Sequence, residues 1–457
     1  MDQSMRKVLE VYEEAGELVR VEREVDRDYE ASAVLWKVKR GPAVLFENVK
    51  GSSIPLVGNV LNTRRKMALA MGIEESEVFD NVVRAVENPI KPVPVEDAPC
   101  QEVVVTEGVD LMALLPIPRI HEKDGGPYLS AAVFITKDPD TGIGNVSLNR
   151  LHILGPDKMA TNMSPTNTYE NMRRCWERGE PLECAAVIGS HPAVLVASNM
   201  LVPFGFDELE IAGGLFGKPL EVVRGKTVDL KVPAATEVVI EGEIRPNDLD
   251  EEGPFGEFAG LYAARKQNPV IRVRAVTFRS NPLLQTINGS DHPEHLIIGG
   301  IAREATLFQG VRDNVSSVKR VFMGEGGSCR LSAVIAMNPR TEGEAKRAIL
   351  AAFANQVLLK YVVAVDEDVD LEDPLAVERA IATRVRAERD ILILPGIQSS
   401  PVVPLSENFT VSKLGIDATR PLDKPAELFE PAGVPEEVMR RVKEDWASYL
   451  PDGVLTV

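Results

Sequence analysis

Apolar and polar positions change their spacing twice along the chain. Over the first 95 residues, helical spacing at residues 8–12 is followed by a continuous apolar run at 43–46, which predicts a helix and then a buried strand. The proline-rich stretch 89–99 is typical of a linker. We therefore expect an N-terminal α/β domain over residues 1–98.

Short apolar or alternating runs, separated by glycine and proline, dominate the chain from about residue 100 to residue 300. Many short strands with such turns are typical of a barrel, so we expect a central β-barrel domain over residues 99–300. Two helices interrupt it, with capping sequences that place Asn167 and Asp207 at their N-caps. The strands are predicted at 102–106, 131–136, 147–154, 193–198, 237–244, 270–278 and 283–287.

After residue 300 helical and strand patterns alternate again. Thr341 and Glu344 have the spacing of a capping box before an alanine-rich helix, and residues 361–365 have the pattern of an apolar strand. An amphipathic helix is expected over about 435–450. The predicted fold class is therefore mixed α/β (α+β), with a third, α/β domain over residues 301–457.

Composition narrows the classes of function. The 457 residues include 51 Lys and Arg against 69 Asp and Glu, a formal net charge of −18. Nucleic acids and anionic membranes are bound through excess positive charge, so we expect neither as a partner. The chain has no apolar run long enough for a membrane helix and no N-terminal signal core, and its four cysteines show no CxxC spacing. These features predict a cytoplasmic protein.

Two polar clusters carry candidate chemistry. Glu252 and Glu257 flank Gly-Pro-Phe-Gly, which favours a turn over a helix or a central strand. Neighbouring carboxylates can acquire different pKa values, which suits acid–base catalysis; an acidic surface turn is the alternative. Upstream, Asn145 and Ser147 share one face of a predicted strand and Arg150 lies on the other. An edge strand with outward polar residues would show the same pattern.

Other candidate groups have simple structural explanations when taken singly. Glu208 lies in the first turn of a helix, where the helix dipole stabilises a carboxylate. Lys413 lies in a polar run, where a lysine is ordinarily solvated. His292 and His295, followed by Arg303, fit either a turn at a helix end or a group that binds an anion.

Taken in order, these segments resemble the UbiD family of decarboxylases, which use prenylated FMN. The resemblance covers nearly the whole chain and implies an N-terminal α/β domain, a central split β-barrel that binds flavin, and a C-terminal α/β domain. The motifs that carry it are Asn145 with Arg150, Glu208 downstream of Ser198-Asn-Met200-Leu-Val-Pro203, the loop from Glu252 to Glu257, and the run from Ser412 to Thr419.

The resemblance also implies roles for individual residues. Prenylated FMN, made by a separate flavin prenyltransferase, would be bound with Mn²⁺ or Mg²⁺ and with K⁺. Arg150, Glu252 and Glu257 would be catalytic. The implied cofactor contacts are Asn145, Ser147, Arg150, Ser198, Met200, Glu208 and Lys413. Asn145 and Glu208 would bind the divalent ion, with Asn167 at the position where many relatives have histidine.

Loss of CO₂ from an sp² carbon requires an electron sink, and no side chain supplies one, so a cofactor is needed. The expected reaction is reversible, non-oxidative decarboxylation of an aromatic, heteroaromatic or α,β-unsaturated acid. If His292, His295 and Arg303 bind a distal anionic group, furan-2,5-dicarboxylate or a similar furan or pyrrole acid is the best candidate. The alternatives are a hydroxybenzoate-type or isoprenoid-pathway acid, or a non-catalytic flavin-binding protein. The resemblance implies a homodimer or homohexamer.

Overall fold

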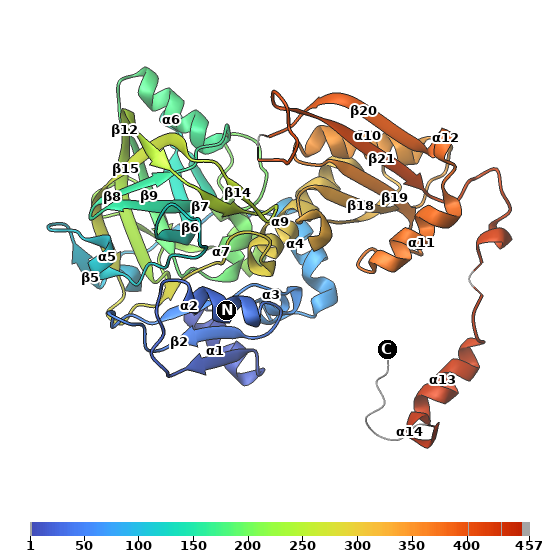
Figure 1. The fold of residues 1–457 in the computed structure, drawn as a ribbon, viewed down its shortest axis with the longest axis horizontal. Coiled ribbons are helices and arrows are strands. Elements are labelled where there is room, and N and C mark those ends of the chain that lie inside the picture. The colour runs from blue at the N-terminus through green and yellow to red at the C-terminus, as the bar shows by residue number, and fades with distance from the viewer. Residues whose placement is uncertain (1, 401, 431, 450–457) are drawn as a thin grey trace.

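The computed structural model describes residues 2–400, 402–430 and 432–449. Two small helix-and-strand regions flank a barrel in these ranges, and the last residues extend away from the body (Figure 1). Within the described residues, no helix combines the length and the apolar character needed to cross a membrane. The predicted mixed α/β fold class is confirmed.

The N-terminal region packs helices on a small mixed sheet. Its elements are α1 (Met5–Glu14), β1 (Leu18–Val21), α2 (Glu30–Lys37), β2 (Ala43–Phe46), β3 (Leu56–Gly58), α3 (Arg64–Met71), α4 (Val78–Glu87) and the distant β16 (Leu284–Gln285). The strand order is β1-β2-β3-β16, and β16 lies parallel to β3. The chain therefore returns to this sheet after it has formed the barrel.

The barrel is closed by six antiparallel strands. They are β6 (Tyr128–Lys137), β7 (Gly144–Gly155), β8 (Lys158–Thr161), β9 (Leu182–Ile188), β12 (Val238–Glu252) and β15 (Lys266–Phe278). Their order is β12-β9-β6-β7-β8-β15, and β15 pairs back with β12. All six contribute apolar side chains to one hydrophobic cluster, for which the alternation along each strand is the cause. The short β5 (Val103–Val105) extends the sheet beside β15.

Three helices pack against the barrel: α6 (Asn167–Glu177), α7 (Pro192–Ala197) and α8 (Glu208–Phe216). The strand predicted at 193–198 is wrong, because Pro192 occupies the first turn and the Nδ1 atom of His191 accepts a hydrogen bond from Ala193 N at 3.1 Å. A short apolar run does not distinguish a buried strand from a buried helix. Asp207 caps α8 as predicted.

The C-terminal region is a five-stranded sheet covered on both faces. It follows the long helix α9 (Pro293–Arg312), which spans the boundary predicted at residue 300. The other elements are β17 (Val318–Phe322), β18 (Ser332–Met337), α10 (Glu344–Asn355), β19 (Tyr361–Asp366), α11 (Pro374–Arg384), α12 (Ala387–Asp390), β20 (Ile391–Gln398) and β21 (Thr410–Ala418). The strand order is β17-β18-β19-β21-β20, with β18, β19 and β21 parallel. Gly343, rather than the predicted Thr341, holds the N-cap position of α10.

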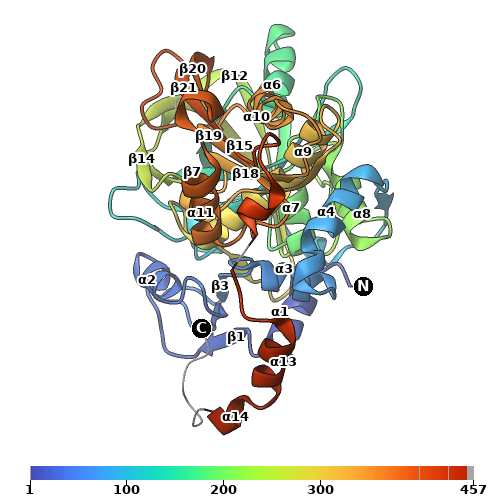
Figure 2. The same cartoon turned by 90° about the vertical axis from the view of Figure 1, so that its right-hand side faces the viewer.

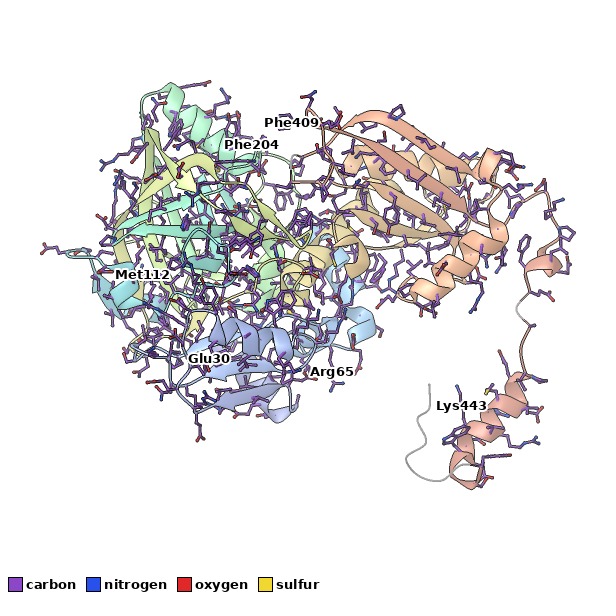
Figure 3. The ribbon with its side chains drawn as sticks, viewed as in Figure 1. Glu30, Arg65, Met112, Phe204, Phe409 and Lys443 are labelled. Carbon is purple, nitrogen blue, oxygen red and sulfur yellow. The ribbon has the colours of Figure 1, made fainter. Side chains whose placement is uncertain are left out.

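The chain after β21 forms an arm that leaves the body (Figures 1 and 2). It ends in α13 (Glu436–Glu444) and α14 (Trp446–Tyr449), which correspond to the predicted amphipathic helix; its last predicted residue, Leu450, lies outside the described ranges. No residue of α13 is buried, and Lys443 stands apart from the side chains of the body (Figure 3).

Candidate active site

The three residues predicted to be catalytic meet at one end of the barrel. Arg150 comes from β7, Glu252 ends β12, and Glu257 ends the short strand β13 (Phe255–Glu257). Arg150 Nε donates to Glu252 Oε1 at 3.0 Å, Nη2 donates to Oε2 at 3.3 Å, and Nη1 donates to Glu257 Oε1. Gly253 turns the chain between the two carboxylates with φ +95°, a conformation that favours glycine.

The two carboxylates differ in their surroundings. Glu252 is 1% exposed and also accepts hydrogen bonds from the side chains of Tyr128 and Asn268, each at 3.1 Å. Among the described residues, Glu257 accepts a side-chain hydrogen bond only from Arg150. Burial lowers the pKa of Arg150, but the charges of Glu257 and Glu252 outweigh it and hold that pKa above its ordinary value. In this cluster the Arg150 cation therefore lies between Glu252, which several hydrogen bonds hold in place, and Glu257, which is less restrained.

A second polar cluster lies beside β7, around Asn145 and Ser147. Asn145 Nδ2 donates to Thr168 Oγ1 at 2.8 Å, and Ser147 Oγ lies 3.3 Å from the same hydroxyl. Glu208 Oε2 accepts a hydrogen bond from the backbone N–H of Val146 at 2.7 Å. These contacts put the amide, two hydroxyls and a carboxylate around one segment of β7, as strand alternation predicts for Asn145 and Ser147.

The surroundings of the Glu208 carboxylate suit a bound cation. It is 3% exposed, and burial raises the pKa of its carboxyl to about 8, with the Val146 hydrogen bond lowering it only in part. No Lys, Arg or His of the described residues lies within ion-pair distance of it, and an unpaired buried carboxylate is costly. The described residues contain no group of three or more His, Cys, Asp and Glu side chains that could bind a metal. An ion here would rely on hard oxygen donors, which suits Mn²⁺ or Mg²⁺.

Asn167 does not join this cluster. The helix α6 begins at Asn167 with Thr166 at the N-cap position, so the predicted capping role of Asn167 is wrong. Asn167 Nδ2 points to the carbonyl oxygen of Val202 at 3.4 Å, whereas the buried Thr168 faces Asn145. The predicted start of this helix, with Asn167 as the cap, lies one residue too late, and so Thr168 was not considered as a partner of Asn145.

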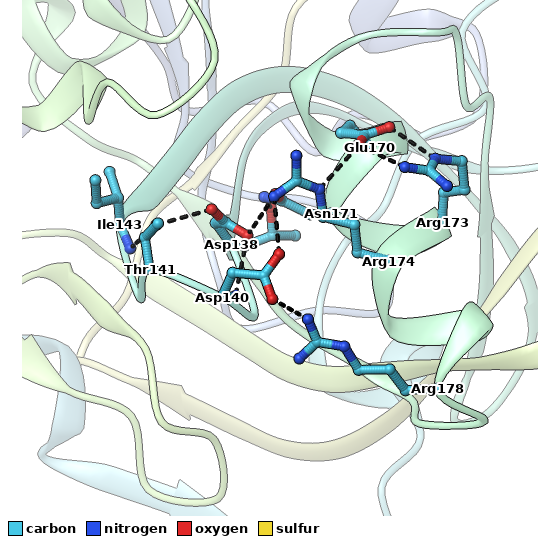
Figure 4. Close-up of polar contacts among 10 residues, drawn as sticks. Asp138, Asp140, Thr141, Ile143, Glu170, Asn171, Arg173, Arg174 and Arg178 are labelled. Carbon is cyan, nitrogen blue, oxygen red and sulfur yellow. Dashed lines mark hydrogen bonds and ion pairs between the residues drawn. The ribbon is translucent and has the colours of Figure 1, made fainter.

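The position of α6 is fixed by an ion-pair network on its outer face (Figure 4). Arg174 pairs with Asp138 at 3.3 Å and with Asp140 at 2.9 Å, both from the turn between β6 and β7, and Arg178 pairs with Asp140. Asn171 Nδ2 donates to the Thr136 hydroxyl at 3.1 Å. Exposed pairs contribute little singly, but together they tie α6 to the strands that carry Asn145.

The remaining predicted cofactor contacts lie in two places. Ser198 and the buried Met200 follow α7, and the Ser198 carbonyl accepts a hydrogen bond from Leu148 N of β7 at 3.1 Å. Lys413 is buried in the C-terminal sheet, where Nζ donates to the Val357 carbonyl at 3.1 Å and burial lowers its pKa to about 8. The structure does not bring Lys413 to Glu208, and its role toward a phosphate stays a prediction.

Two predicted substrate residues begin α9. His292 is the N-cap: its Nδ1 accepts a hydrogen bond from Glu294 N at 3.3 Å, and its ring packs edge-on against Trp36 with centroids 5.0 Å apart. His295 Nδ1 lies 2.9 Å from the Ser290 carbonyl oxygen. Burial, followed by the charges of Arg330 and Arg150, lowers the pKa of His295 to about 3, so this ring is neutral near pH 7.

Arg303 converges with Arg330, which sequence reasoning missed. A Cβ atom on Gly299 would lie 2.7 Å from Arg330 Nη2 and 2.9 Å from Arg303 Nη1, so both guanidinium groups crowd the same glycine. Arg330 Nη2 also donates to the His295 carbonyl at 3.3 Å. Burial and the charge of Arg330 lower the pKa of Arg303 to about 9, and burial lowers that of Arg330 although Glu257 opposes it.

These two guanidinium groups form a cationic pair at Gly299. Among the described residues, no carboxylate lies within ion-pair distance of Arg303 or Arg330, and Arg303 Nε has no hydrogen-bond partner. The charge of Arg150 acts to lower the pKa of His295 and the charge of Glu257 to raise that of Arg330, so this region is within electrostatic range of two of the three predicted catalytic residues. Buried, unpaired positive charge of this kind suits an anion.

Comparison with known proteins identifies the family. Three consecutive family models match: the N-terminal domain of 3-octaprenyl-4-hydroxybenzoate carboxy-lyase at residues 9–86, its Rift-related domain at 91–291 and its C-terminal domain at 296–418. The chain belongs to the UbiD family. The predicted family and enzyme class, carboxy-lyase, are thereby confirmed. The domain boundaries at residues 98 and 300 stay predictions.

Relatives of this UbiD-family chain match it over most of their length. An anhydromevalonate phosphate decarboxylase of Methanothermobacter thermautotrophicus is 37% identical over 403 residues, 88% of this chain and 94% of the relative. The UbiD-class enzyme HmfF from Pelotomaculum thermopropionicum, solved in complex with FMN, is 42% identical with a TM-score of 0.92, covering 98% of this chain and 100% of HmfF. An evolved dimeric form of HmfF in complex with prFMN is 41% identical, covers 98% and 100%, and has a TM-score of 0.90.

Proposed function

We propose that this UbiD-family chain is a prenylated-FMN-dependent decarboxylase whose substrate carries a second anionic group beside the carboxylate that leaves. The observation that carries this proposal is the pair Arg303 and Arg330, whose guanidinium groups converge on Gly299, form no ion pair with a carboxylate of the described residues and lie within electrostatic range of Glu257. A substrate with one carboxylate would leave that positive charge uncompensated.

The residues around β7 fit the cofactor. Asn145, Ser147 and Glu208 would hold a divalent ion, Mn²⁺ or Mg²⁺, at the flavin phosphate, because Glu208 is a buried carboxylate without a protein cation. Prenylated FMN would supply the electron sink that decarboxylation requires. A separate flavin prenyltransferase would provide it, and K⁺ would bind beside Glu208 through neighbouring main-chain oxygens. Support comes from the prFMN complex of the evolved HmfF.

Arg150, Glu252 and Glu257 each have a separate role in the reaction. Arg150 orients the substrate carboxylate through its guanidinium, which offers donors in a planar fork. Glu252 holds Arg150 through two hydrogen bonds. Glu257, which has the fewest restraints, transfers a proton to the substrate carbon after CO₂ has left. The same groups serve the reverse carboxylation at high CO₂.

The second anion admits two substrate chemistries. The preferred candidate is furan-2,5-dicarboxylate or a similar furan or pyrrole diacid, whose distal carboxylate would bind Arg303, Arg330 and the neutral His295. A phosphate-bearing unsaturated acid is the second candidate, favoured by the relative named anhydromevalonate phosphate decarboxylase. A hydroxybenzoate-type acid is disfavoured, since its ring has no use for two guanidinium groups.

Matched substrates distinguish these candidates. Protein co-expressed with a flavin prenyltransferase should release CO₂ from furan-2,5-dicarboxylate about ten- to a hundredfold more efficiently than from furan-2-carboxylate, the value of a charge-assisted contact. Preference for anhydromevalonate phosphate over the diacid would select the second candidate. Equal kcat/KM for the monoacid and the diacid, with no turnover of the phosphate, would contradict an anion-binding role for Arg303 and Arg330.

The C-terminal arm supports a homo-oligomer. Val438, Val442 and Trp446 recur at helical spacing on α13 and α14, and α13 buries none of its residues against its own body. Leu428 on the same arm is 68% exposed. We infer that a second copy covers this apolar stripe in a homodimer or homohexamer. Light scattering of the full chain should give a multimer and of the chain ending at residue 420 a smaller species; the same mass for both would contradict it.

A further inference from the structure

The carboxylate of Glu252 is held by side chains other than Arg150. Its Oε1 accepts a hydrogen bond from Tyr128 Oη at 3.1 Å, and its Oε2 accepts one from Asn268 Nδ2 at 3.1 Å. With the two hydrogen bonds from Arg150, each oxygen of Glu252 has two donors. In each of these four contacts the partner donates, so the arrangement is complementary to the ionised carboxylate.

Ring packing sets the position of the Tyr128 hydroxyl. The Tyr128 ring stacks on His152 with centroids 4.6 Å apart and an angle of 14° between planes, and it packs against Phe255 at 4.6 Å. Phe255 in turn lies under the Arg150 guanidinium, 4.9 Å from its ring centre. The tyrosine is buried, and burial raises its pKa, so it stays a donor. Its hydroxyl also lies 3.4 Å from the Pro254 carbonyl oxygen, the more distant of its two acceptors.

We propose that Tyr128 and Asn268 are positioning residues of the decarboxylation site. They hold Glu252 rigidly, which fixes Arg150 for the substrate carboxylate and leaves Glu257 as the one carboxylate free to exchange a proton. This inference rests on the proposed function, because it assigns the carboxylates different tasks in that reaction. If the Arg150 guanidinium were misplaced, the reaction rate would fall because the substrate carboxylate would be poorly oriented, while the fold would stay intact.

Other charges around Glu252 set the pH behaviour. The charged or titratable groups around it are Arg150 and His152 of β7, Tyr128 of β6, Glu257 of β13 and Lys266, its cross-strand partner on β15. Asp124 and Arg265 of the adjoining loops act on His152, and Asp124 also acts on Tyr128. Within the described ranges, Arg150 is the one cation at ion-pair distance from Glu252. A second carboxylate placed at Asn268 would therefore face Glu252 without a counterion of its own.

The first test removes one donor and keeps the ring. Tyr128→Phe retains the stacking on His152 and should lower kcat/KM about ten- to a hundredfold, the usual effect of losing a hydrogen bond to a charged group. The control is Tyr262→Phe: Tyr262 is 43% exposed, and within the described ranges its hydroxyl accepts a hydrogen bond only from Lys123 N, at 3.2 Å. That variant should keep the wild-type kcat/KM.

The second test needs no activity. Asn268→Asp places a second carboxylate against Glu252, so the pair retains a proton and its pKa in the folded protein rises above the unfolded value. The folded state then binds more protons than the unfolded one, and stability falls as pH rises. The Tm deficit of Asn268→Asp against wild type should grow between about pH 5 and pH 8, while that of Asn268→Leu should stay constant.

The outcomes separate the two proposals. Wild-type kcat/KM in Tyr128→Phe, or a Tm deficit of Asn268→Asp that does not change with pH, would overturn the positioning role. Failure of the wild-type holoenzyme to release CO₂ from any acid would refute the proposed function instead. In that case the stability measurements on the apoprotein would still report whether the Glu252 network exists.

Discussion

Replacing Arg303 by methionine should make the unliganded protein more stable and its substrate selectivity worse. Methionine keeps an unbranched chain against Gly299 and removes one of two crowded guanidinium groups. In the absence of an anion, the folded protein bears the cost of both charges, which neither a carboxylate nor full hydration offsets. Binding sites commonly hold such unfavourable arrangements, and their removal raises stability at the expense of function.

The lowered pKa of Arg303 gives the size of this cost. Against an ordinary value of about 12.5, a pKa of about 9 corresponds to roughly 4–5 kcal/mol against the charged form. The side chain keeps some contact with solvent, and the variant loses the hydrogen bond to the Gly299 carbonyl, so we expect a net gain of about 1–2 kcal/mol. At about 1 °C per kcal/mol for a chain of 457 residues, the Tm should rise by roughly 1–2 °C.

The assay compares Tm values of FMN-loaded protein with and without furan-2,5-dicarboxylate. Wild type should gain Tm on binding the diacid, because a ligand that binds only the folded state stabilises it, and Arg303→Met should gain little. The control is Arg347→Met, since Arg347 is exposed on α10 and its side chain makes no ion pair with the described residues. A lower Tm for unliganded Arg303→Met than for wild type, with an undiminished gain from the diacid, would refute this reasoning.

Three further predictions concern the other residues. Glu257→Gln should keep cofactor binding, measured by absorbance, and lose at least about a hundredfold in turnover; near-normal turnover would place the proton donor elsewhere. Because burial raises the pKa of Glu208 to about 8, Mn²⁺ must displace a proton there, so calorimetry should show tighter Mn²⁺ binding as pH rises from 6 to about 8 and none in Glu208→Gln. Thr168→Val removes the hydroxyl that holds Asn145 and should weaken Mn²⁺ and flavin binding about tenfold, whereas Asn167→Ala should not; the reverse order of the two variants would restore Asn167 as the ligand.

The sequence predicts the elements of this fold wherever the spacing of apolar residues is enough to distinguish a strand from a helix. The barrel strands alternate and β15 and β12 are long, so their existence follows from pattern, but the closure between them depends on pairing at a distance. The helix at Pro192–Ala197 was not predicted, because an apolar run of six residues fits either a strand or a helix. The feature that identifies it as a helix is the N-cap formed by His191.

The residues of the site also fall into two groups: those that a sequence motif predicts, and those that only the folded structure brings together. Arg150, Glu252 and Glu257 belong to recognisable motifs, and the structure brings them together. Arg330 belongs to no local pattern and acquires its place only because the fold presses it against Gly299 of a distant helix. Tertiary convergence of this sort leaves no periodic signal in one sequence.

The parallel pairing of β16 with β3 has a consequence for synthesis on the ribosome. Until residues 284–285 have emerged, the N-terminal sheet ends at β3 with an unpaired edge, and exposed edges invite pairing with other chains. At about 5–20 residues per second, the barrel segment between them takes roughly ten to forty-five seconds to make. A fragment that stops near residue 98 would keep that edge indefinitely, so the N-terminal region should be produced together with the barrel rather than as an isolated domain.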